Sequence, residues 1–161
     1  MSPANSPRNN RTVRALADRR WQISSLAIVS LGSNIEPRAE YLKRAITALS
    51  ALPETTFVRA SSVLETEPVD VPSEFAELKF FNQAAIFETK LDVFDFSRRM
   101  HAIEDDLGRV RTVRNGPRTI DIDLIDFGGQ VINTPELTLP HPRAKDRAFV
   151  LEPLRELCIK F

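Results

Sequence analysis

The segment GPRTIDIDLID, residues 116–126, combines the periodicity of a β-strand with two regularly spaced carboxylates. Asp121 and Asp123 alternate with aliphatic residues, so a strand would place both carboxylates on one face and the aliphatic side chains on the other. Carboxylates about 6–7 Å apart on one face repel each other by roughly 3 kcal/mol at an effective dielectric constant of about 20. We therefore predict that a divalent cation lies between them.

Alternating apolar and acidic residues also describe an ordinary strand with one solvated face, and this interpretation stays open for Asp-Ile-Asp taken alone. The flanking residues favour the metal site, because aspartate is uncommon in strands and Arg118 precedes the pair directly after a Gly-Pro turn. Carboxylate oxygens suit Mg²⁺, which usually keeps several waters and completes its coordination with substrate phosphates. The segment therefore indicates phosphoryl or pyrophosphoryl chemistry.

Basic residues gather just before this strand. Arg109, Arg111 and Arg114 lie in a polar segment bracketed by Gly108 and Gly116, which we predict to be a mobile loop that closes over bound substrate. Guanidinium groups bind phosphate oxygens in pairs and keep their charge, so arginines beside metal-binding carboxylates suit a polyphosphate substrate. Loop closure would exclude water that competes as the phosphoryl acceptor. For any single arginine, a solvated charged loop remains the alternative.

Other polar residues are candidates for ligand contacts or caps. His141 lies between two prolines, a rigid setting from which its ring can donate to a phosphate oxygen. Asn82 offers the paired donor and acceptor that read the edge of a heterocycle, although a structural role stays open for it. Ser33 and Asn34 follow a predicted strand, but the chain has neither GxxxxGK[ST] nor GxGxxG, so we expect them near a helix cap, with a direct ligand contact as the alternative.

Hydrophobic periodicity predicts one α+β domain. The element order is β-α-β-β-α-β, which is the ferredoxin-like arrangement: an antiparallel sheet with helices on one face and the other face left for function. A further short strand and a C-terminal helix are predicted after it. The expected strands are 25–31, 57–64, 80–89, the carboxylate strand and a short one near 131–132; the expected helices follow Pro37 and span 93–107 and about 146–157.

Composition narrows the class of protein. The 161 residues, 42% of them hydrophobic, suffice for one domain with a buried core. Lys and Arg total 22, as do Asp and Glu, so no basic excess indicates nucleic-acid binding, and no apolar run approaches the roughly 20 residues of a membrane span. The one cysteine, Cys158, fits a cytoplasmic protein. We expect residues 1–24 to form a flexible N-terminal extension and residues 25–161 the domain.

The motifs above resemble a known family. GRVRTVRNGPRTIDIDLIDFG and VINTPELTLPHPRAKDRAFVLEPL, with GSN near the start, resemble the 6-hydroxymethyl-7,8-dihydropterin pyrophosphokinases of folate biosynthesis. The resemblance implies transfer of the terminal pyrophosphoryl group of ATP to the hydroxymethyl oxygen of the pterin, with release of AMP and with two Mg²⁺ ions. Its partners would be these two small-molecule substrates. We expect the protein to be a monomer, and the resemblance is compatible with its working beside other folate enzymes.

The resemblance also implies roles for individual residues. Asp121 and Asp123 resemble the metal ligands, and the catalytic residues it implies are Arg109, Arg118 and Asp123. The ATP-binding residues it implies are Glu104, Arg111, Arg118, Thr138, His141 and Arg147. The pterin-binding residues it implies are Thr66, Pro68, Val69, Phe80, Asn82 and Phe149. His101 stands where a nucleotide-binding glutamine is common, so this position departs from the pattern.

Three other functions compete with this reading. A non-catalytic pterin- or nucleotide-binding paralogue would keep the pockets without turnover. Another metal-dependent phosphotransferase built on a DxD strand would release products other than AMP. An RNA-binding module of the same fold is opposed by the neutral charge balance and by the acidic strand face.

Overall fold

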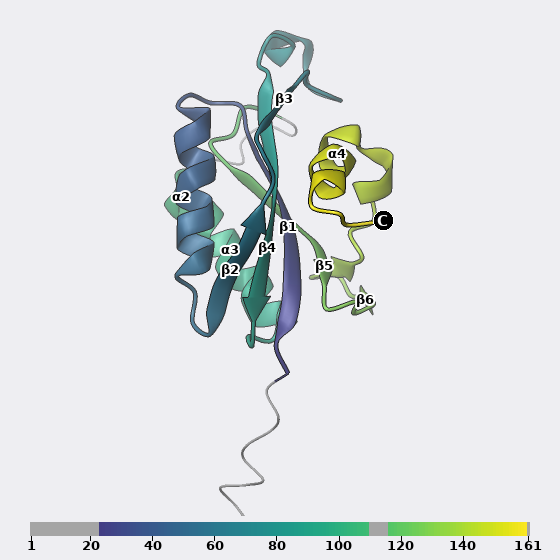
Figure 1. Ribbon diagram of the computed structural model, residues 1–161. Coiled ribbons are helices and arrows are strands. Elements are labelled where there is room, and N and C mark those ends of the chain that lie inside the picture. Colours follow the sequence, from purple (N-terminus) through teal and green to yellow (C-terminus); the bar gives the residue numbers. More distant parts are fainter. Residues whose placement is uncertain (1–22, 110–115, 161) are drawn as a thin grey trace, which may run out of the picture.

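An antiparallel sheet forms the centre of the computed structural model, which describes residues 23–109 and 116–160 (Figure 1). Strand β1 (Ser25–Ser33) is central because it pairs with both β4 (Phe80–Thr89) and β5 (Asp121–Phe127). Strands β2 (Thr55–Ala60) and β3 (Leu64–Thr66) pair with different parts of β4. The resulting order β2-β4-β1-β5 confirms the predicted ferredoxin-like sheet.

The second predicted strand, 57–64, is two strands in the structure, and the break has a local cause. Ser61 follows β2, and its hydroxyl accepts a hydrogen bond from the Ala84 amide at 3.0 Å, while its own amide donates to the Ala84 carbonyl at 2.9 Å. A side-chain oxygen thus takes the place of a backbone carbonyl in the ladder, which interrupts regular pairing at this point. The chain resumes pairing at β3, which is shifted along β4.

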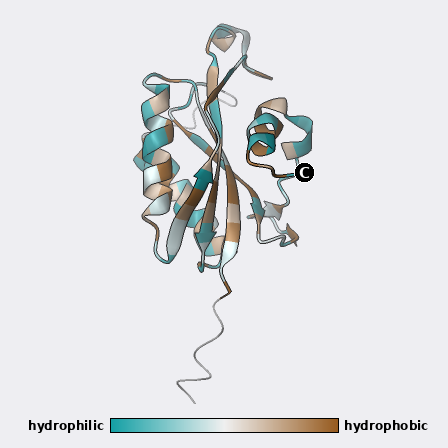
Figure 2. Ribbon diagram, in the orientation of Figure 1, coloured by the Kyte–Doolittle hydropathy of each residue, from teal (hydrophilic) through white to brown (hydrophobic). Residues whose placement is uncertain are grey.

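Helices α2 (Arg38–Ser50) and α3 (Val93–Asp106) cover one face of the sheet, as predicted (Figure 1). The apolar stripes of α2 and α3 share one core cluster with every second residue of β1, and α2 packs on β1, β2 and β4 whereas α3 packs on β5. In Figure 2, hydrophobic residues dominate the central strands, whereas α2 mixes hydrophobic and hydrophilic residues. Asp92 caps α3 by accepting hydrogen bonds from the Phe94 and Asp95 amides, which satisfies two otherwise unpaired donors.

Helix α4 (Ala148–Glu156) lies on the opposite face of the sheet from α2 and α3 (Figure 1). Its residues Val150 and Leu154 belong to a second apolar cluster with Ala84 and Ile125 of the sheet. Glu156 fastens the helix by accepting hydrogen bonds from the amide and hydroxyl of Ser62, at 2.8 and 2.7 Å. The face that we expected to be left open is therefore partly covered, and the rest of it holds the candidate site described below.

Strand β5 contains an irregularity that matters for the site. Its register against β1 shifts between Ile28 and Val29, so Leu124 and Phe127 both pack in the helix-covered core, whereas Ile125 faces α4. The Ile125 carbonyl then accepts a hydrogen bond from the His141 amide at 2.9 Å. The bulge thereby holds the segment after β5 against the strand that carries the two aspartates.

The remaining elements are short. The predicted strand near 131–132 is β6 (Ile132–Asn133), which pairs with β7 (Thr138–Leu139), a strand absent from the predicted elements. Two 3₁₀ turns, η1 (Ser73–Phe75) and η2 (Ala144–Asp146), complete the structure. Among the described residues, no helix is long and apolar enough to cross a membrane. Apart from Ile23 and Ser24, the predicted extension lies outside the described residues, as do Arg111 and Arg114.

Candidate active site

Asp121 and Asp123 lie on the face of β5 opposite to α2 and α3, as their spacing predicted. Their register partners on β1 are Gly32 and Ser30, respectively. Both partners have small side chains, so the sheet leaves space in front of the carboxylates, and Asp121 and Asp123 remain 22% and 34% exposed. A Cβ atom at position 32 would lie 3.3 Å from the Asn82 Oδ1 atom, which shows how closely this wall of the site is packed.

Two arginines neutralise Asp121 from different directions. Arg118 Nη1 lies 3.1 Å from one carboxylate oxygen, and Arg109 Nη1 contacts the other. Arg109 also contacts Glu104, whose side chain is fully buried, and Glu104 in turn lies 2.7 Å from the His101 Nδ1 atom. Arg109 is therefore anchored by a buried carboxylate while it reaches the strand with the two aspartates.

Asn34 fixes the backbone of Arg118. The Asn34 side-chain Oδ1 accepts a hydrogen bond from the Arg118 backbone amide at 2.7 Å. The Asn34 backbone amide donates to the Arg118 carbonyl at 3.3 Å. Asn34 is 5% exposed, so this pairing is shielded from water. Our expectation of a helix-cap role was wrong, because Pro37 is the capping residue of α2 and no side chain caps that end.

The electrostatics of the site are those of crowded carboxylates. Burial raises the pKa of Asp123 to about 7, and the negative charges of Asp121 and Glu104 act in the same direction, against the positive charge of Arg147. Burial opposes the charged form of Arg109, but Asp121 and Glu104 outweigh it and raise the Arg109 pKa. Burial and Arg147 lower the pKa of His141, whose Nε2 atom lies 3.9 Å from Asp123.

A carboxylate whose pKa is raised by burial and by neighbouring carboxylates is well suited to a divalent cation. Within residues 23–109 and 116–160, no group of three or more His, Cys, Asp or Glu side chains could hold a metal ion. Two aspartates alone fit Mg²⁺, which binds through one or two carboxylates and leaves the other positions to water and substrate phosphates. They do not fit zinc, which typically requires three or four protein ligands.

Two pockets meet at Asp123. The first has an empty volume of about 680 Å³, including the part open to solvent, and is lined by both aspartates, β3, the chain after it and α4. Its lining residues are Ser30, Gly32, Thr66, Glu67, Val69, Asp70, Val71, Phe80, Asn82, Arg118, Asp121, Asp123, Arg143, Arg147 and Phe149. The second, of about 480 Å³ by the same measure, lies between α3, β5 and the segment around β7. Its lining residues are Ser97, Met100, His101, Ile122, Asp123, Leu124, Glu136, Leu137, Thr138, His141 and Pro142.

Residues 28–159, which include nearly all of this fold and both pockets, match the family model described as 7,8-dihydro-6-hydroxymethylpterin-pyrophosphokinase (HPPK). The chain belongs to the HPPK family. Two of its curated relatives carry the name 2-amino-4-hydroxy-6-hydroxymethyldihydropteridine pyrophosphokinase. The Bacillus subtilis protein is 40% identical over 136 residues, which cover 84% of this chain and 80% of the relative. The Pseudomonas aeruginosa protein is 40% identical over 129 residues, which cover 80% of this chain and 78% of the relative.

Solved structures agree with the fold. A crystal structure described as HPPK-DHPS in complex with substrates superposes with a TM-score of 0.62 at 13% sequence identity. The match covers 84% of this chain but only 40% of the solved chain, so this HPPK-family chain corresponds to one part of that larger protein. At this identity the likeness supports the ferredoxin-like fold and nothing further.

The first pocket gathers most of the residues that the HPPK resemblance implied for the pterin. Thr66, Val69, Phe80, Asn82 and Phe149 all line it, whereas Pro68 does not. The Asn82 amide nitrogen donates to the Thr66 hydroxyl at 2.6 Å, which fixes the orientation of the Asn82 side chain.

The residues implied for ATP are divided. Thr138 and His141 line the second pocket, as expected for a shared ligand. Arg118 and Arg147 line the first pocket instead, and Glu104 is buried behind Arg109 rather than exposed in either. Arg111 lies outside the described residues. These positions do not test the roles themselves, which remain proposals.

Several residues of the site were missed by sequence reasoning. Ser30, Gly32, Glu67, Asp70, Val71 and Arg143 line the first pocket, and His101, noted above only as a departure from the family pattern, lines the second. The small residues at 30 and 32 carry a weak signal, because they alternate on the strand like the aspartates opposite them. Glu67, Asp70 and Val71 lie in a segment without periodicity, so no pattern could have assigned them to a pocket.

Proposed function

We propose that the two pockets hold the two substrates of a pyrophosphoryl transfer, with the reacting groups meeting in front of Asp121 and Asp123. The donor is ATP and the acceptor is 6-hydroxymethyl-7,8-dihydropterin, the reaction expected of an HPPK-family protein. The hydroxymethyl oxygen attacks the β-phosphorus, the bond from that phosphorus to the oxygen bridging it to the α-phosphate breaks, and AMP leaves. The hydroxyl proton passes to water, because the acceptor oxygen needs orientation more than a strong base.

The pterin is assigned to the first pocket. Phe80 and Phe149 supply aromatic surface for a flat heterocycle. Arg118 lies over the Phe80 ring, with Cζ 5.5 Å from the ring centre, and Arg147 lies over the Phe149 ring. Asn82 and Thr66, already hydrogen-bonded to each other, offer polar groups to the edge of the ring. Stacking would supply most of the affinity and these polar groups the specificity.

The nucleotide is assigned to the second pocket, with its phosphates directed toward Asp123. Thr138 and His141 would contact it there, and Arg109 and Arg118 would neutralise the phosphate oxygens from the side of Asp121. Glu104 would act indirectly, since its buried carboxylate holds Arg109 in place. Arginine suits this role because it stays charged and presents paired donors to phosphate oxygens.

Asp121 and Asp123 would hold two Mg²⁺ ions. When bound, Mg²⁺ neutralises the charge that develops on the phosphate oxygens during transfer. The four carboxylate oxygens provide only part of two coordination spheres, so phosphate oxygens and waters would complete them. This assignment explains why two carboxylates that repel each other are kept side by side on one strand.

The single observation that carries the proposal is that Asp123 belongs to the wall of both pockets. To test it, the protein is incubated with ATP, Mg²⁺ and 6-hydroxymethyl-7,8-dihydropterin, and the nucleotides are separated by chromatography. AMP formed only in the presence of the pterin is the expected result. ADP would indicate a different phosphotransferase, and binding of both substrates without turnover would indicate a non-catalytic paralogue.

The expected monomeric state and cytoplasmic location stay predictions. Light scattering coupled to size-exclusion chromatography would test the first, and fractionation of the producing cell would test the second.

A further inference from the structure

We infer that Arg38, which lines neither pocket, positions the wall of the first pocket and thereby sets the affinity for the substrate bound there. This inference rests on the proposed function, because it takes the first pocket to be the pterin site. Arg38 is the first residue of α2, yet its side chain is only 15% exposed. A charged side chain this deeply placed at a helix terminus requires an explanation.

The contacts of Arg38 explain its burial. Its Nε donates to the Glu36 carboxylate at 2.6 Å, and its Nη1 donates to the Glu65 carboxylate at 3.0 Å and to the Lys79 carbonyl at 3.1 Å. Its guanidinium also stacks on Phe81, with Cζ 3.7 Å from the ring centre. One side chain therefore joins the start of α2 to both β3 and the beginning of β4.

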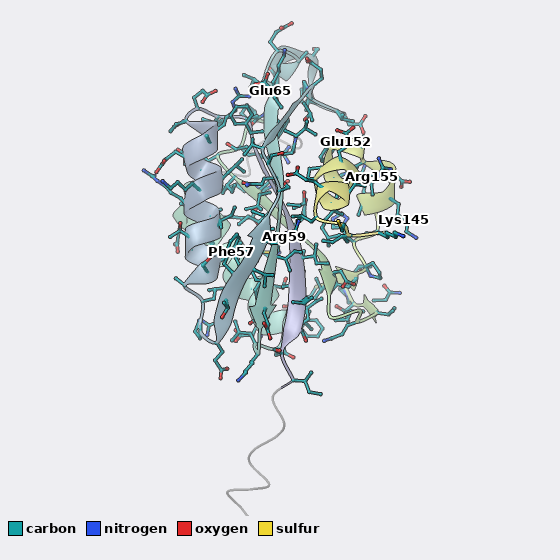
Figure 3. The ribbon with its side chains drawn as sticks, viewed as in Figure 1. Phe57, Arg59, Glu65, Lys145, Glu152 and Arg155 are labelled. Atoms are coloured by element: carbon teal, nitrogen blue, oxygen red, sulfur yellow. The ribbon has the colours of Figure 1, made fainter. Side chains whose placement is uncertain are left out.

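These contacts matter because β3 and β4 are the base of a long excursion of the chain. Residues 66–80 leave the sheet at β3, pass through η1 and return at β4, and they project beyond the helices at one end of the molecule (Figure 1). This excursion supplies six lining residues of the first pocket: Thr66, Glu67, Val69, Asp70, Val71 and Phe80. Figure 3 labels Glu65 near the end of the molecule from which this excursion projects.

Apart from the hydrogen bond between Asn82 and Thr66, the other side-chain links across the base of the excursion are weak. The Lys79–Glu67 ion pair spans 3.3 Å between side chains that are 49% and 73% exposed, and such exposed pairs contribute little. Strand β3 has only three residues, so its ladder with β4 is short. The partly buried guanidinium, with three acceptors and an aromatic ring, is the stronger tie.

The two arginines near β4 act on opposite faces of that strand. Phe81 contacts Arg38 on the face of β4 that is turned to α2. Its neighbour Phe80 contacts Arg118 on the face that is turned to the first pocket. Loosening Phe81 would therefore shift Phe80 and the paired residue Thr66, both of which line the pocket. The effect of Arg38 on the substrate is indirect, which makes it a positioning residue.

The test compares Arg38→Ala with the full-length wild type. Binding of 6-hydroxymethylpterin is followed by its fluorescence, ATP binding by calorimetry, and turnover by AMP release. We expect Arg38→Ala to weaken pterin binding and raise the pterin KM about tenfold, with ATP affinity unchanged within about twofold and kcat lowered less than the KM is raised. Amide hydrogen exchange should accelerate within residues 64–82 and stay unchanged in α3 and β5.

Three further variants make the result specific. Arg44→Ala removes an arginine of the same helix whose ion pair with Glu40 is exposed, and it should leave all readouts unchanged. Arg38→Lys keeps the charge but loses the planar fork, so it should lie between wild type and alanine. Glu65→Gln removes the negative charge of one partner and should shift pterin binding in the same direction, which keeps the inference testable if Arg38→Ala does not fold.

Different results would refute the proposed function and the role of Arg38. If the wild type forms no AMP with the pterin, the proposed function fails. If the wild type is active but Arg38→Ala and Glu65→Gln both bind the pterin as tightly as Arg44→Ala does, the role of Arg38 is refuted. An equal loss of pterin and ATP affinity, with faster exchange throughout the protein, would also overturn it, since that pattern marks general destabilisation.

Discussion

Replacing Asp123 by asparagine should stabilise the metal-free protein at alkaline pH. The folded protein raises the pKa of Asp123 from 3.8 to about 7, so it binds a proton that the unfolded chain has already released. The contribution of Asp123 to stability therefore falls as the pH rises from about 4 to about 7, and it stays low above that. Asparagine has no such charge, so Asp123→Asn should escape this loss.

The size of the effect follows from the same values. The difference between the two pKa values corresponds to at most about 4 kcal/mol at high pH, of which roughly 2–3 kcal/mol accumulates between pH 5 and pH 8.5. The side chain is 34% exposed, so solvent screening reduces the effect, and we expect about 1 kcal/mol. Urea unfolding in EDTA at these two pH values measures it as the stability of Asp123→Asn minus that of the wild type.

Taking the difference between the two proteins removes the titration of groups that do not interact with Asp123. The stability advantage of the variant should grow from pH 5 to pH 8.5. Added Mg²⁺ should then stabilise the wild type more than the variant, which keeps only Asp121 of the two proposed ligands. A constant difference between the proteins, or an advantage that shrinks as the pH rises, would refute the reasoning that crowded carboxylates store unfavourable charge at this site.

Three other changes test the site. Asn34→Ala removes the acceptor of the Arg118 amide, so steady-state kinetics should show kcat lowered about tenfold, whereas an unchanged kcat would mean that Arg118 needs no such support. Gly32→Ala places a methyl group 3.3 Å from the Asn82 Oδ1 atom, so the pterin KM should rise roughly three- to tenfold while the ATP KM stays constant. Equal changes in the two KM values would contradict the assignment of the pterin to the first pocket. EDTA should abolish AMP formation and Mg²⁺ should restore it, and turnover that persists in EDTA would exclude the proposed metal role of the aspartates.

The sequence predicted the order of the main elements because each has a strong local pattern. The alternation in residues 121–127 and the helical spacing in 93–106 are visible without tertiary information. The break at Ser61 was not predictable, because it depends on a hydrogen bond from the Ala84 amide to the Ser61 hydroxyl, and Ala84 lies in β4, elsewhere in the chain. The face covered by α4 was equally hidden, because amphipathicity shows that a helix packs but does not show on which surface.

The site divides in the same way. Strand geometry alone predicted that Asp121 and Asp123 share a face, and the structure confirms it. The link from Glu104 through Arg109 to Asp121 joins a helix to a strand across residues 110–115, so no spacing rule gives it. Arg38 could not be found from sequence at all, because its partners come from three separate segments.

The pairing of Asn34 with Arg118 bears on how the protein folds. These residues are 84 positions apart, and β1, which carries the chain to Asn34, finds both of its neighbouring strands only in the second half of the sequence. Closing such large loops is slow, because the entropy lost on closure precedes the gain from contacts. During synthesis, the central strand therefore waits without a strand partner until β4 and then β5 leave the ribosome, and neither pocket is complete before that moment.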